Sequence, residues 1–208
     1  MKLAQEHAMI TVAITGGIAM GKSTVVENLR IIFPQEAFFD ADECVRELLT
    51  RREICETIAL EFGKAVLDRK GEINRSHLRS QVFDNAKRRA ALEGILHPEV
   101  HKCYLKVNQE AAADAASILF ADIPLLFESE HEYSQDLVIV VACDKDTQLQ
   151  RLQKRPGIDS LLAHRMVAVQ LPIEHKVELA DHVIWNSGTL KQLQQQTKYF
   201  AQWLKQKI

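Results

Sequence analysis

The feature that most constrains how this chain can fold is a glycine-containing loop, GGIAMGKST, over residues 16–24. The loop directly follows Ile10 to Thr15, a short β-branched run that predicts a buried strand. It leads into the segment from Thr24 to Phe33, whose apolar residues recur at helical spacing until Pro34 ends the pattern. A strand, a glycine loop and a helix in this order are typical of an α/β fold, in which strands and helices alternate along the chain.

The spacing within the loop fits the pattern G-x-x-x-x-G-K-[ST], with Gly16, Gly21, Lys22 and Ser23 at the fixed positions. Glycines let backbone N–H groups point into a concavity, and a helix that starts at Lys22 directs its positive dipole end there, so the loop suits the phosphates of ATP. We expect Lys22 to reach the β- and γ-phosphates and Ser23 to bind Mg²⁺. The alternative is a turn that merely uses glycines, and the Lys-Ser pair argues against it. The expected nucleotide-binding residues are Gly17, Ala19, Met20, Gly21, Lys22, Ser23 and Thr24.

The composition limits the class of the protein and its partners. A chain of 208 residues that is 47% hydrophobic can form the core of a single α/β domain with a helical insertion. The formal net charge of −2 offers no general attraction for nucleic acid or for an anionic membrane. Residues 1–9 form a short polar extension, and neither a signal peptide nor a membrane span is expected. Four cysteines without a C-x-x-C pair suggest reduced thiols in a cytoplasmic protein, which we expect to be a monomer.

Five apolar runs have the length of strands and alternate with helical patterns, which predicts a five-stranded parallel sheet covered by helices. The runs are Ile10–Thr15, Ala37–Phe39, Ile118–Ile123, Leu137–Ala142 and His182–Trp185. The long gap between the second and third runs shows only helical periodicity, so we expect residues 43–116 to be a helical insertion. The core of this single domain, residues 1–208, would then comprise 10–42 and 117–208. An amphipathic helix over Leu190–Lys207 is expected to pack on the sheet.

Turn and cap signals divide the helical insertion. The stretch LDRKGEIN has turn chemistry and ends in Asn74, a plausible N-cap for the next helix. Further along, Pro98 predicts the start of another helix, with His97 at its cap. The H-x-E-x-H pattern of residues 97–101 differs from the H-E-x-x-H of a zinc helix, so we do not expect a metal there. Because ligands of open α/β sheets bind at the carboxyl ends of the strands, an insertion in this position can hold a second substrate.

Acidic residues follow two of the predicted strands, at the edge where ligands bind. Asp40 and Asp42 lie at the end of the second run, in FFDADE, where a carboxylate can accept a hydroxyl proton or hold Mg²⁺. One of these two aspartates could instead cap the helix that begins near Glu43. Asp122, at the end of the third run, is a second candidate for supporting Mg²⁺.

Two arginines follow the fourth run. Arg151 and Arg155 are four residues apart and would share one face of a helix. Two guanidinium groups on one face suit the negative charge that develops on a transferring phosphoryl group. A solvated, charged helix is the alternative interpretation of the same spacing.

Seven segments, in this order along the chain, resemble the dephospho-coenzyme A kinase family. They are TGGIAMGKST, FFDADECVREL, FGKAVLDRKGEINRSHLRSQVF, LEGILHPEV, DIPLLFE, QLQRLQKR and ADHVIWNSG. They extend from about residue 10 to residue 190, and the DAD, HP and PLL-x-E elements are much more specific than a phosphate loop alone. The resemblance implies a P-loop kinase fold and a Mg²⁺-dependent transfer of the γ-phosphoryl group of ATP to the ribose 3′-hydroxyl of dephospho-CoA, the last step of coenzyme A synthesis.

The resemblance also implies roles for individual residues. Asp42 matches the second acid of the DAD motif and is the candidate general base, with Asp40 in support. Lys22 and the two arginines would stabilise the transferring phosphoryl group, the arginines as part of a lid over about residues 146–172. The implied acceptor-binding residues are Asp40, Arg46, Arg79, His97 and Pro98, and those near the adenine are Asn186 and Gly188.

Three positions depart from the family's usual pattern. Ala19 and Met20 stand where the family's loop usually has glycine and serine, which leaves open whether Ala19 takes the backbone angles of a glycine. Lys176 stands where the family commonly has arginine, so a bidentate phosphate contact would become a point charge. Two other functions stay open: a nucleoside or nucleotide kinase of the same fold, and a nucleotide-dependent switch that phosphorylates no small molecule.

Overall fold

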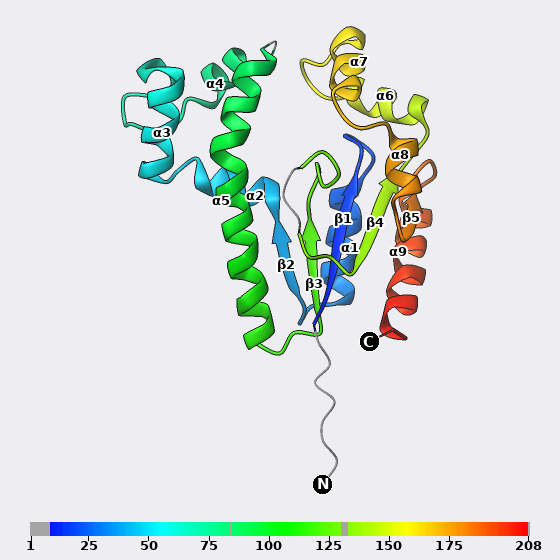
Figure 1. Cartoon of the computed structure of the whole chain (residues 1–208). Helices are drawn as coiled ribbons and strands as arrows, with labels where there is room; N and C mark the ends of the chain where they lie inside the picture. The colour runs from blue at the N-terminus through cyan, green and yellow to red at the C-terminus, as the bar shows by residue number, and fades with distance from the viewer. Residues whose placement is uncertain (1–8, 84, 130–132, 208) are drawn as a thin grey trace. The chain divides into compact units, whose positions relative to one another are not determined.

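The computed structural model describes residues 9–83, 85–129 and 133–207, and a five-stranded parallel sheet is the centre of the fold (Figure 1). The strand order is β2-β3-β1-β4-β5. The strands are β1 Ile10–Gly16, β2 Ala37–Asp40, β3 Ile118–Asp122, β4 Leu137–Ala142 and β5 His182–Trp185. All five apolar runs are therefore confirmed as strands, with no end shifted by more than one residue. The polar N-terminal extension, apart from Met9, lies outside the described residues.

The register of the sheet aligns the ends of its central strands. β1 pairs in parallel with β3 on one side and with β4 on the other. Ile14 lies opposite Asp122 of β3 and opposite Ile139 of β4. β1, β3 and β4 are buried along nearly their whole length, as expected for the middle strands of a parallel sheet. The loop that leaves β1 therefore starts beside the carboxyl end of β3.

Two helices, α1 (Lys22–Ile32) and α9 (Leu190–Lys205), pack against each other and complete the main hydrophobic core. The predicted packing of the C-terminal helix on the sheet is confirmed, although α9 ends two residues earlier than expected. Its buried residues are Leu193, Thr197, Phe200, Ala201 and Leu204. No helix in the described part of the chain has both the length and the apolar character needed to cross a membrane.

Three shorter helices follow β4: α6 (Lys145–Gln153), α7 (Ser160–Ala168) and α8 (Ile173–Glu178). The first two start at aspartates that accept a hydrogen bond from the backbone, Asp144 from the N–H of Thr147 and Asp159 from the N–H of Leu162. Such caps satisfy backbone N–H groups that a helix leaves unpaired at its start.

The chain between β2 and β3 is helical, and most of it forms a second compact unit, Asp40–Lys106. The other unit comprises the described residues up to Phe39 and from Val107 onward. The second unit contains α2 Ala41–Leu48, α3 Arg52–Phe62, the 3-10 helix η1 Lys64–Val66, α4 Arg75–Val82 and most of α5 Ala86–Ala113. The predicted N-cap is confirmed, because Asn74 Oδ1 accepts the N–H of His77 at the start of α4.

The prediction that Pro98 starts a helix is wrong, because Pro98 lies inside α5, a continuous helix of 28 residues. Proline inside a helix removes one hydrogen bond and crowds the carbonyl of the residue four positions earlier. That residue is Gly94, which is exposed and has no atom near the position of a Cβ, so its carbonyl can be hydrated. His97 is therefore a residue within the helix and not its cap.

Candidate active site

The phosphate loop connects β1 to α1, and its last glycine explains where the helix starts. Gly21 is the N-cap of α1, with φ +94, a left-handed angle that favours glycine. A Cβ at Gly21 would lie 2.1 Å from Nδ2 of Asn186, which is too close for any side chain. Gly21 has no side chain with which to cap the helix, so the N–H groups of its first turn form a site suited to an anion.

Ala19 adopts the left-handed angles that are expected of a glycine, with φ +61. The N–H of Met20 donates to the carbonyl of Gly17 at 3.2 Å, which closes a turn with Ala19 at its third position. Type II turns have a positive φ at this position, and glycine usually supplies it. An alanine in this conformation costs about 1–2 kcal/mol. The loop thus holds an alanine in a conformation typical of glycine, while Met20 is buried, with an exposed fraction of 1%.

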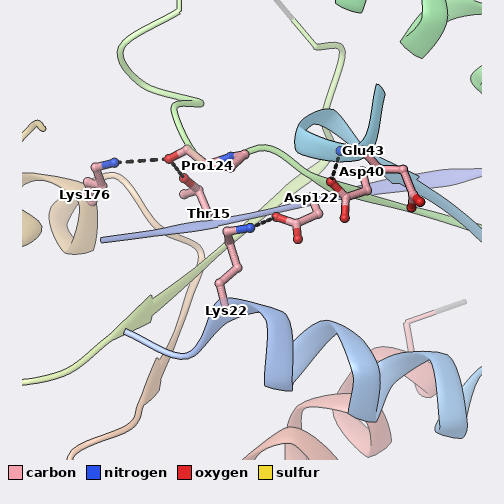
Figure 2. A network of polar contacts seen from close by, with 7 residues as sticks. All are labelled: Thr15, Lys22, Asp40, Glu43, Asp122, Pro124 and Lys176. Atoms are coloured by element: carbon pink, nitrogen blue, oxygen red, sulfur yellow. Dashed lines mark hydrogen bonds and ion pairs between the residues drawn. The ribbon is translucent and has the colours of Figure 1, made fainter. Parts of the chain in front are cut away.

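Lys22 and Asp122 form an ion pair between Nζ and Oδ1 (Figure 2). Lys22 is the first residue of α1 and Asp122 is the last residue of β3, so the register of the sheet brings them together. Asp122 is only 4% exposed, and a buried carboxylate requires a cation or hydrogen-bond donors. The structure therefore joins the lysine expected at the phosphates to the carboxylate expected at the metal.

The oxygen atoms around this ion pair suit Mg²⁺. Two oxygen ligands for Mg²⁺ are present here: the carboxylate of Asp122 and the hydroxyl of Ser23. Ser23 is exposed in the first turn of α1. In the described ranges no group of three or more His, Cys, Asp or Glu side chains could hold a metal ion. Mg²⁺ is usually held by one or two carboxylates together with water and the phosphates of the substrate. The carboxylate of Asp122 at the end of β3 and the hydroxyl of Ser23 at the start of α1 are ligands of this kind.

The two aspartates that follow β2 differ in their surroundings. Asp40 Oδ1 accepts the N–H of Glu43 at 2.8 Å, so Asp40 is the N-cap of α2 (Figure 2). Asp42 lies in the first turn of α2 and is exposed. The alternative that one aspartate caps the helix is thus confirmed for Asp40. The carboxylate of Asp42 makes no cap and is accessible for proton transfer.

The second unit carries all of the residues that the family resemblance assigned to the acceptor. Arg46 is exposed on α2, four residues after Asp42, which places the two on the same face of the helix. The backbone carbonyl of Arg46 accepts a hydrogen bond from the guanidinium of Arg75 at 3.2 Å. Arg79 is exposed on α4, while His97 and Pro98 lie in the middle of α5.

Helix α6 follows β4, and the carboxylate of Asp144 is its N-cap. The pKa of Asp144 is lowered to about 2, first by the N–H of Thr147 and then by the hydroxyls of Ser187 and Thr147. These donors stabilise the ionised carboxylate. The negative carboxylate lies at the positive end of the helix dipole and so stabilises the start of α6, the helix that carries Arg151.

The prediction that Arg151 and Arg155 share a helix face is wrong. α6 ends at Gln153, and Arg155 lies in the following turn, where its N–H donates to the carbonyl of Leu152. Pro156 comes next, and the residue before a proline is disfavoured in a helix. Arg151 is in the helix, and its Nη2 lies 3.5 Å from Oδ1 of Asn186. Within the described chain, Nη1 of Arg151 is buried and has no hydrogen-bond partner.

Asn186 and Gly188, which were expected near the adenine, lie after β5 in different surroundings. Asn186 is 6% exposed, and its Nδ2 donates to the carbonyl of Met20 at 2.9 Å, so this side chain supports the phosphate loop. Gly188 lines a surface pocket of about 370 Å³. The residues that line this pocket are Trp185, Ser187, Gly188, Gln192, Gln195 and Gln196.

Lys176 on α8 is fully buried and holds the segment after β3 in place. Its Nζ lies 2.8 Å from Oε1 of Glu128 and 3.5 Å from the carbonyl of Pro124, which also accepts the hydroxyl of Thr15 at 3.0 Å (Figure 2). Oε1 of Glu128 accepts a second hydrogen bond, from the N–H of Leu171 at 3.0 Å. The ammonium group of Lys176 is therefore used inside the protein.

Two glutamines that the sequence analysis did not single out contact the phosphate loop. Oε1 of Gln170 accepts the N–H of Ile18, and Nε2 of Gln148 donates to the carbonyl of Ile18. Gln148 lies in the segment QLQRLQKR, which carried part of the family resemblance, so that segment was the available signal. No local pattern marked Gln170, because its partner is 152 residues away in the chain.

Comparisons with known proteins identify one family. The family model described as dephospho-CoA kinase matches residues 10–192. A dephospho-CoA kinase of Fusobacterium nucleatum subsp. nucleatum is 32% identical over 197 residues, which cover 94% of this chain and 98% of the relative.

Solved structures show the same fold. A protein from Thermus thermophilus aligns with a TM-score of 0.77 at 30% identity, covering 94% of this chain and 98% of its own. A dephospho-CoA kinase from Campylobacter jejuni aligns with a TM-score of 0.64 at 26% identity, covering 92% of this chain and 95% of its own. The expected P-loop kinase fold is thus confirmed. Since the family model spans most of the chain and the relative is similar over nearly its entire length, this chain belongs to the dephospho-CoA kinase family.

Proposed function

We propose that this protein transfers the γ-phosphoryl group of Mg²⁺-ATP to the ribose 3′-hydroxyl of dephospho-CoA, giving coenzyme A and ADP. Membership of the family supports the activity. The observation that carries the proposal for this chain is the arrangement beside β1 and β3, where the uncapped start of α1 and the Lys22–Asp122 ion pair lie together. Backbone N–H groups, a helix N-terminus and a lysine are the donors that hold the phosphates of ATP in P-loop kinases.

On the donor side, the residues act by position and by charge. Lys22 exchanges its carboxylate partner for a phosphate oxygen, and Asp122 and Ser23 would then hold Mg²⁺. The ion, when bound, neutralises charge on the β- and γ-phosphates. Arg151 brings a buried N–H that has no partner among the described residues, and a ligand that accepts its hydrogen bond would explain a buried donor of this kind. Arg155, in the turn after α6, would add a second cation to the lid.

On the acceptor side, Asp42 is the general base. Asp40 is committed to the cap of α2, whereas Asp42 is exposed and can accept the proton of the attacking hydroxyl. Arg46 lies on the same helix face and would hold an anionic group of the acceptor. The remaining acceptor contacts are assigned to Arg79, His97 and Pro98.

The proposal is tested by measuring ADP release from Mg²⁺-ATP with and without dephospho-CoA, together with the mass of the acceptor. We expect acceptor-dependent release and the gain of one phosphate on the acceptor. Release that ignores the acceptor would instead support a nucleotide-dependent switch, and phosphorylation of other nucleosides or nucleotides in a screen would support a kinase with another acceptor.

The role of Asp42 has a separate test. Asp42→Asn should lower kcat by roughly 10²–10⁴-fold and leave ATP binding intact, which is the usual scale for a general base. Asp40→Asn is the matched variant, because asparagine also caps helices, and it should lose much less activity. Equal kcat values for Asp42→Asn and the parent enzyme would remove Asp42 from the mechanism.

We also propose a cytoplasmic monomer that acts on small molecules only. The four cysteines are free, which suits a reducing compartment, although Cys103 is only partly buried. Light scattering at micromolar concentration tests the oligomeric state, with a mass near 23.6 kDa expected.

A further inference from the structure

We propose that Gln148 and Gln170 are positioning residues that hold the two peptides on either side of Ile18 in the phosphate loop, Gly17–Ile18 and Ile18–Ala19, in the orientation required for nucleotide binding. The inference rests on the proposed function only in taking this loop as the ATP site. It concerns how the chain keeps an alanine in a conformation that ordinarily belongs to glycine.

The two glutamines contact opposite sides of one loop residue. The N–H of Ile18 donates to Oε1 of Gln170 at 2.8 Å, and the carbonyl of Ile18 accepts Nε2 of Gln148 at 3.0 Å. Gln148 is only 3% exposed and also packs on the loop, since a Cβ at Gly17 would lie 3.0 Å from its Nε2. Both backbone groups of Ile18 are therefore bound by side chains from outside the loop.

The hydrogen bond from Gln148 determines which way the Ile18–Ala19 peptide faces. Ile18 and Ala19 are the central residues of the turn that the Gly17–Met20 hydrogen bond closes. Type I and type II turns differ by a flip of the peptide between the central residues, and only type II needs a positive φ at the third position. The carbonyl of that peptide belongs to Ile18 and is the group that Gln148 binds. The hydrogen bond therefore opposes the flip that would return Ala19 to a negative φ.

The loop is also fixed on the far side of this peptide. The carbonyl of Met20 accepts Nδ2 of Asn186, which is buried and fills the space beside Gly21. With Ile18 and Met20 both held, the flip of the peptide between them becomes the main remaining freedom of the turn. Gln148 acts on that freedom directly, and Gln170 restrains the preceding Gly17–Ile18 peptide. The cost of the positive φ of Ala19 favours the flip that these hydrogen bonds oppose.

The position of the glutamines connects the loop to the lid segment. Gln148 lies on α6, and Gln170 comes two residues after the end of α7, so the two bracket α7 in the sequence. Both ends of this lid segment are thereby attached to the same residue of the phosphate loop. These two hydrogen bonds therefore couple the conformation of the phosphate loop to the positions of the two ends of the lid segment.

The test uses Gln148→Met and Gln170→Met, each in the parent chain and in an Ala19→Gly background. Methionine keeps the length of the side chain but can neither donate nor accept these amide hydrogen bonds. The readout is the Kd for ADP by calorimetry, without any acceptor. In the parent chain we expect each change to weaken binding by about 5- to 30-fold, the usual effect of an unmade hydrogen bond at a buried backbone group.

In the Ala19→Gly background the same changes should weaken binding by less than about threefold, because glycine takes a positive φ without strain and the binding-competent loop stays populated. Gln150→Met is the matched control, since Gln150 is exposed on the same helix, and it should leave the Kd unchanged. Thermal unfolding of each variant checks that the fold is kept. Gln170 is only partly buried, so Gln170→Met tests the proposal even if Gln148→Met does not fold.

Either of two results would overturn the proposal: an unchanged Kd in the parent chain, or equal losses in the alanine and glycine backgrounds. Equal losses would mean that the glutamines only pack against the loop. The KM for dephospho-CoA should stay within about twofold while the KM for ATP rises, because only the nucleotide side is perturbed. A parent enzyme that binds ADP but does not phosphorylate dephospho-CoA would refute the proposed function and leave this inference standing.

Discussion

Replacing Lys176 by methionine should destabilise the protein through the carboxylate that the change leaves behind. Lys176 is fully buried, and its Nζ lies 2.8 Å from Oε1 of Glu128. Breaking a buried ion pair costs about 3–5 kcal/mol. Here we expect about 2–4 kcal/mol, because Oε1 of the remaining carboxylate still accepts a backbone N–H, although Oε2 is buried and has no hydrogen-bond partner among the described residues. The Glu128 side chain is 20% exposed and keeps its bond from Leu171.

Removing the other partner of the ion pair, Glu128, should lower the free energy of unfolding by more. Glu128→Met leaves the ammonium of Lys176 with no exposure and, among the described residues, with one other polar contact, the carbonyl of Pro124 at 3.5 Å. It also removes the acceptor of the Leu171 N–H, so about 3–5 kcal/mol is expected. The double variant, Lys176→Met with Glu128→Met, removes both charges at once. Its destabilisation should be smaller than the sum of the two single values by about 2–4 kcal/mol.

Urea unfolding followed by tryptophan fluorescence measures this cycle. Trp185 and Trp203 are the two tryptophans of the chain, and both belong to the same compact unit as the ion pair. The slope with urea must be the same in all four proteins for the free energies to be compared. Single effects that add to within about 0.5 kcal/mol would refute the reasoning, because uncoupled sites behave in that way.

Two further predictions concern titrating groups. The folded pKa of Asp144, about 2, lies below its ordinary value of 3.8, so the stabilisation from this cap is complete above about pH 4 and is lost as the pH falls toward 2. Asparagine also caps helices but does not ionise, so the stability advantage of the parent over Asp144→Asn should shrink across that window in urea unfolding, and an advantage that stays constant would contradict the assignment. Burial, with a smaller contribution from the hydrogen bond to Cys103, raises the pKa of the Cys44 thiol to about 12. Iodoacetamide at about pH 8 should therefore leave Cys44 unmodified in the folded protein and alkylate it in urea, since the thiolate is the reactive form. Peptide mass mapping that finds Cys44 labelled rapidly in the folded state would show that it is neither buried nor protonated as described.

The strands and the phosphate loop could be predicted because their signals are local. Each strand is a continuous apolar run in a parallel sheet, and β4 and β5 begin and end at the predicted residues. The start of α1 at Lys22 followed from the spacing of the loop. The residue that caps α2 could be predicted only as Asp40 or Asp42, because the helix was expected to begin near Glu43, whereas it begins at Ala41.

Two local rules failed, and two long-range contacts had no local signal. The expectation that a helix starts at Pro98 failed because Gly94, four residues earlier, is exposed and its carbonyl can be hydrated, so α5 continues through the proline. The expectation that Arg151 and Arg155 share a helix face failed because α6 ends at Gln153, two residues before Arg155, which is followed by Pro156. The Lys176 ion pair and the Gln170 hydrogen bond join residues 48 and 152 positions apart, and no periodic pattern records such pairings.

The second compact unit is one uninterrupted stretch of chain, Asp40–Lys106, inserted between β2 and β3. These two strands are neighbours, and β2 is at the edge of the sheet, so the insertion interrupts neither β1 nor its pairing with β4. Two crossover points in the gene would be enough to exchange this unit as a block. The residues assigned to the acceptor could then diversify during evolution while the phosphate loop, Lys22 and Asp122 were inherited unchanged.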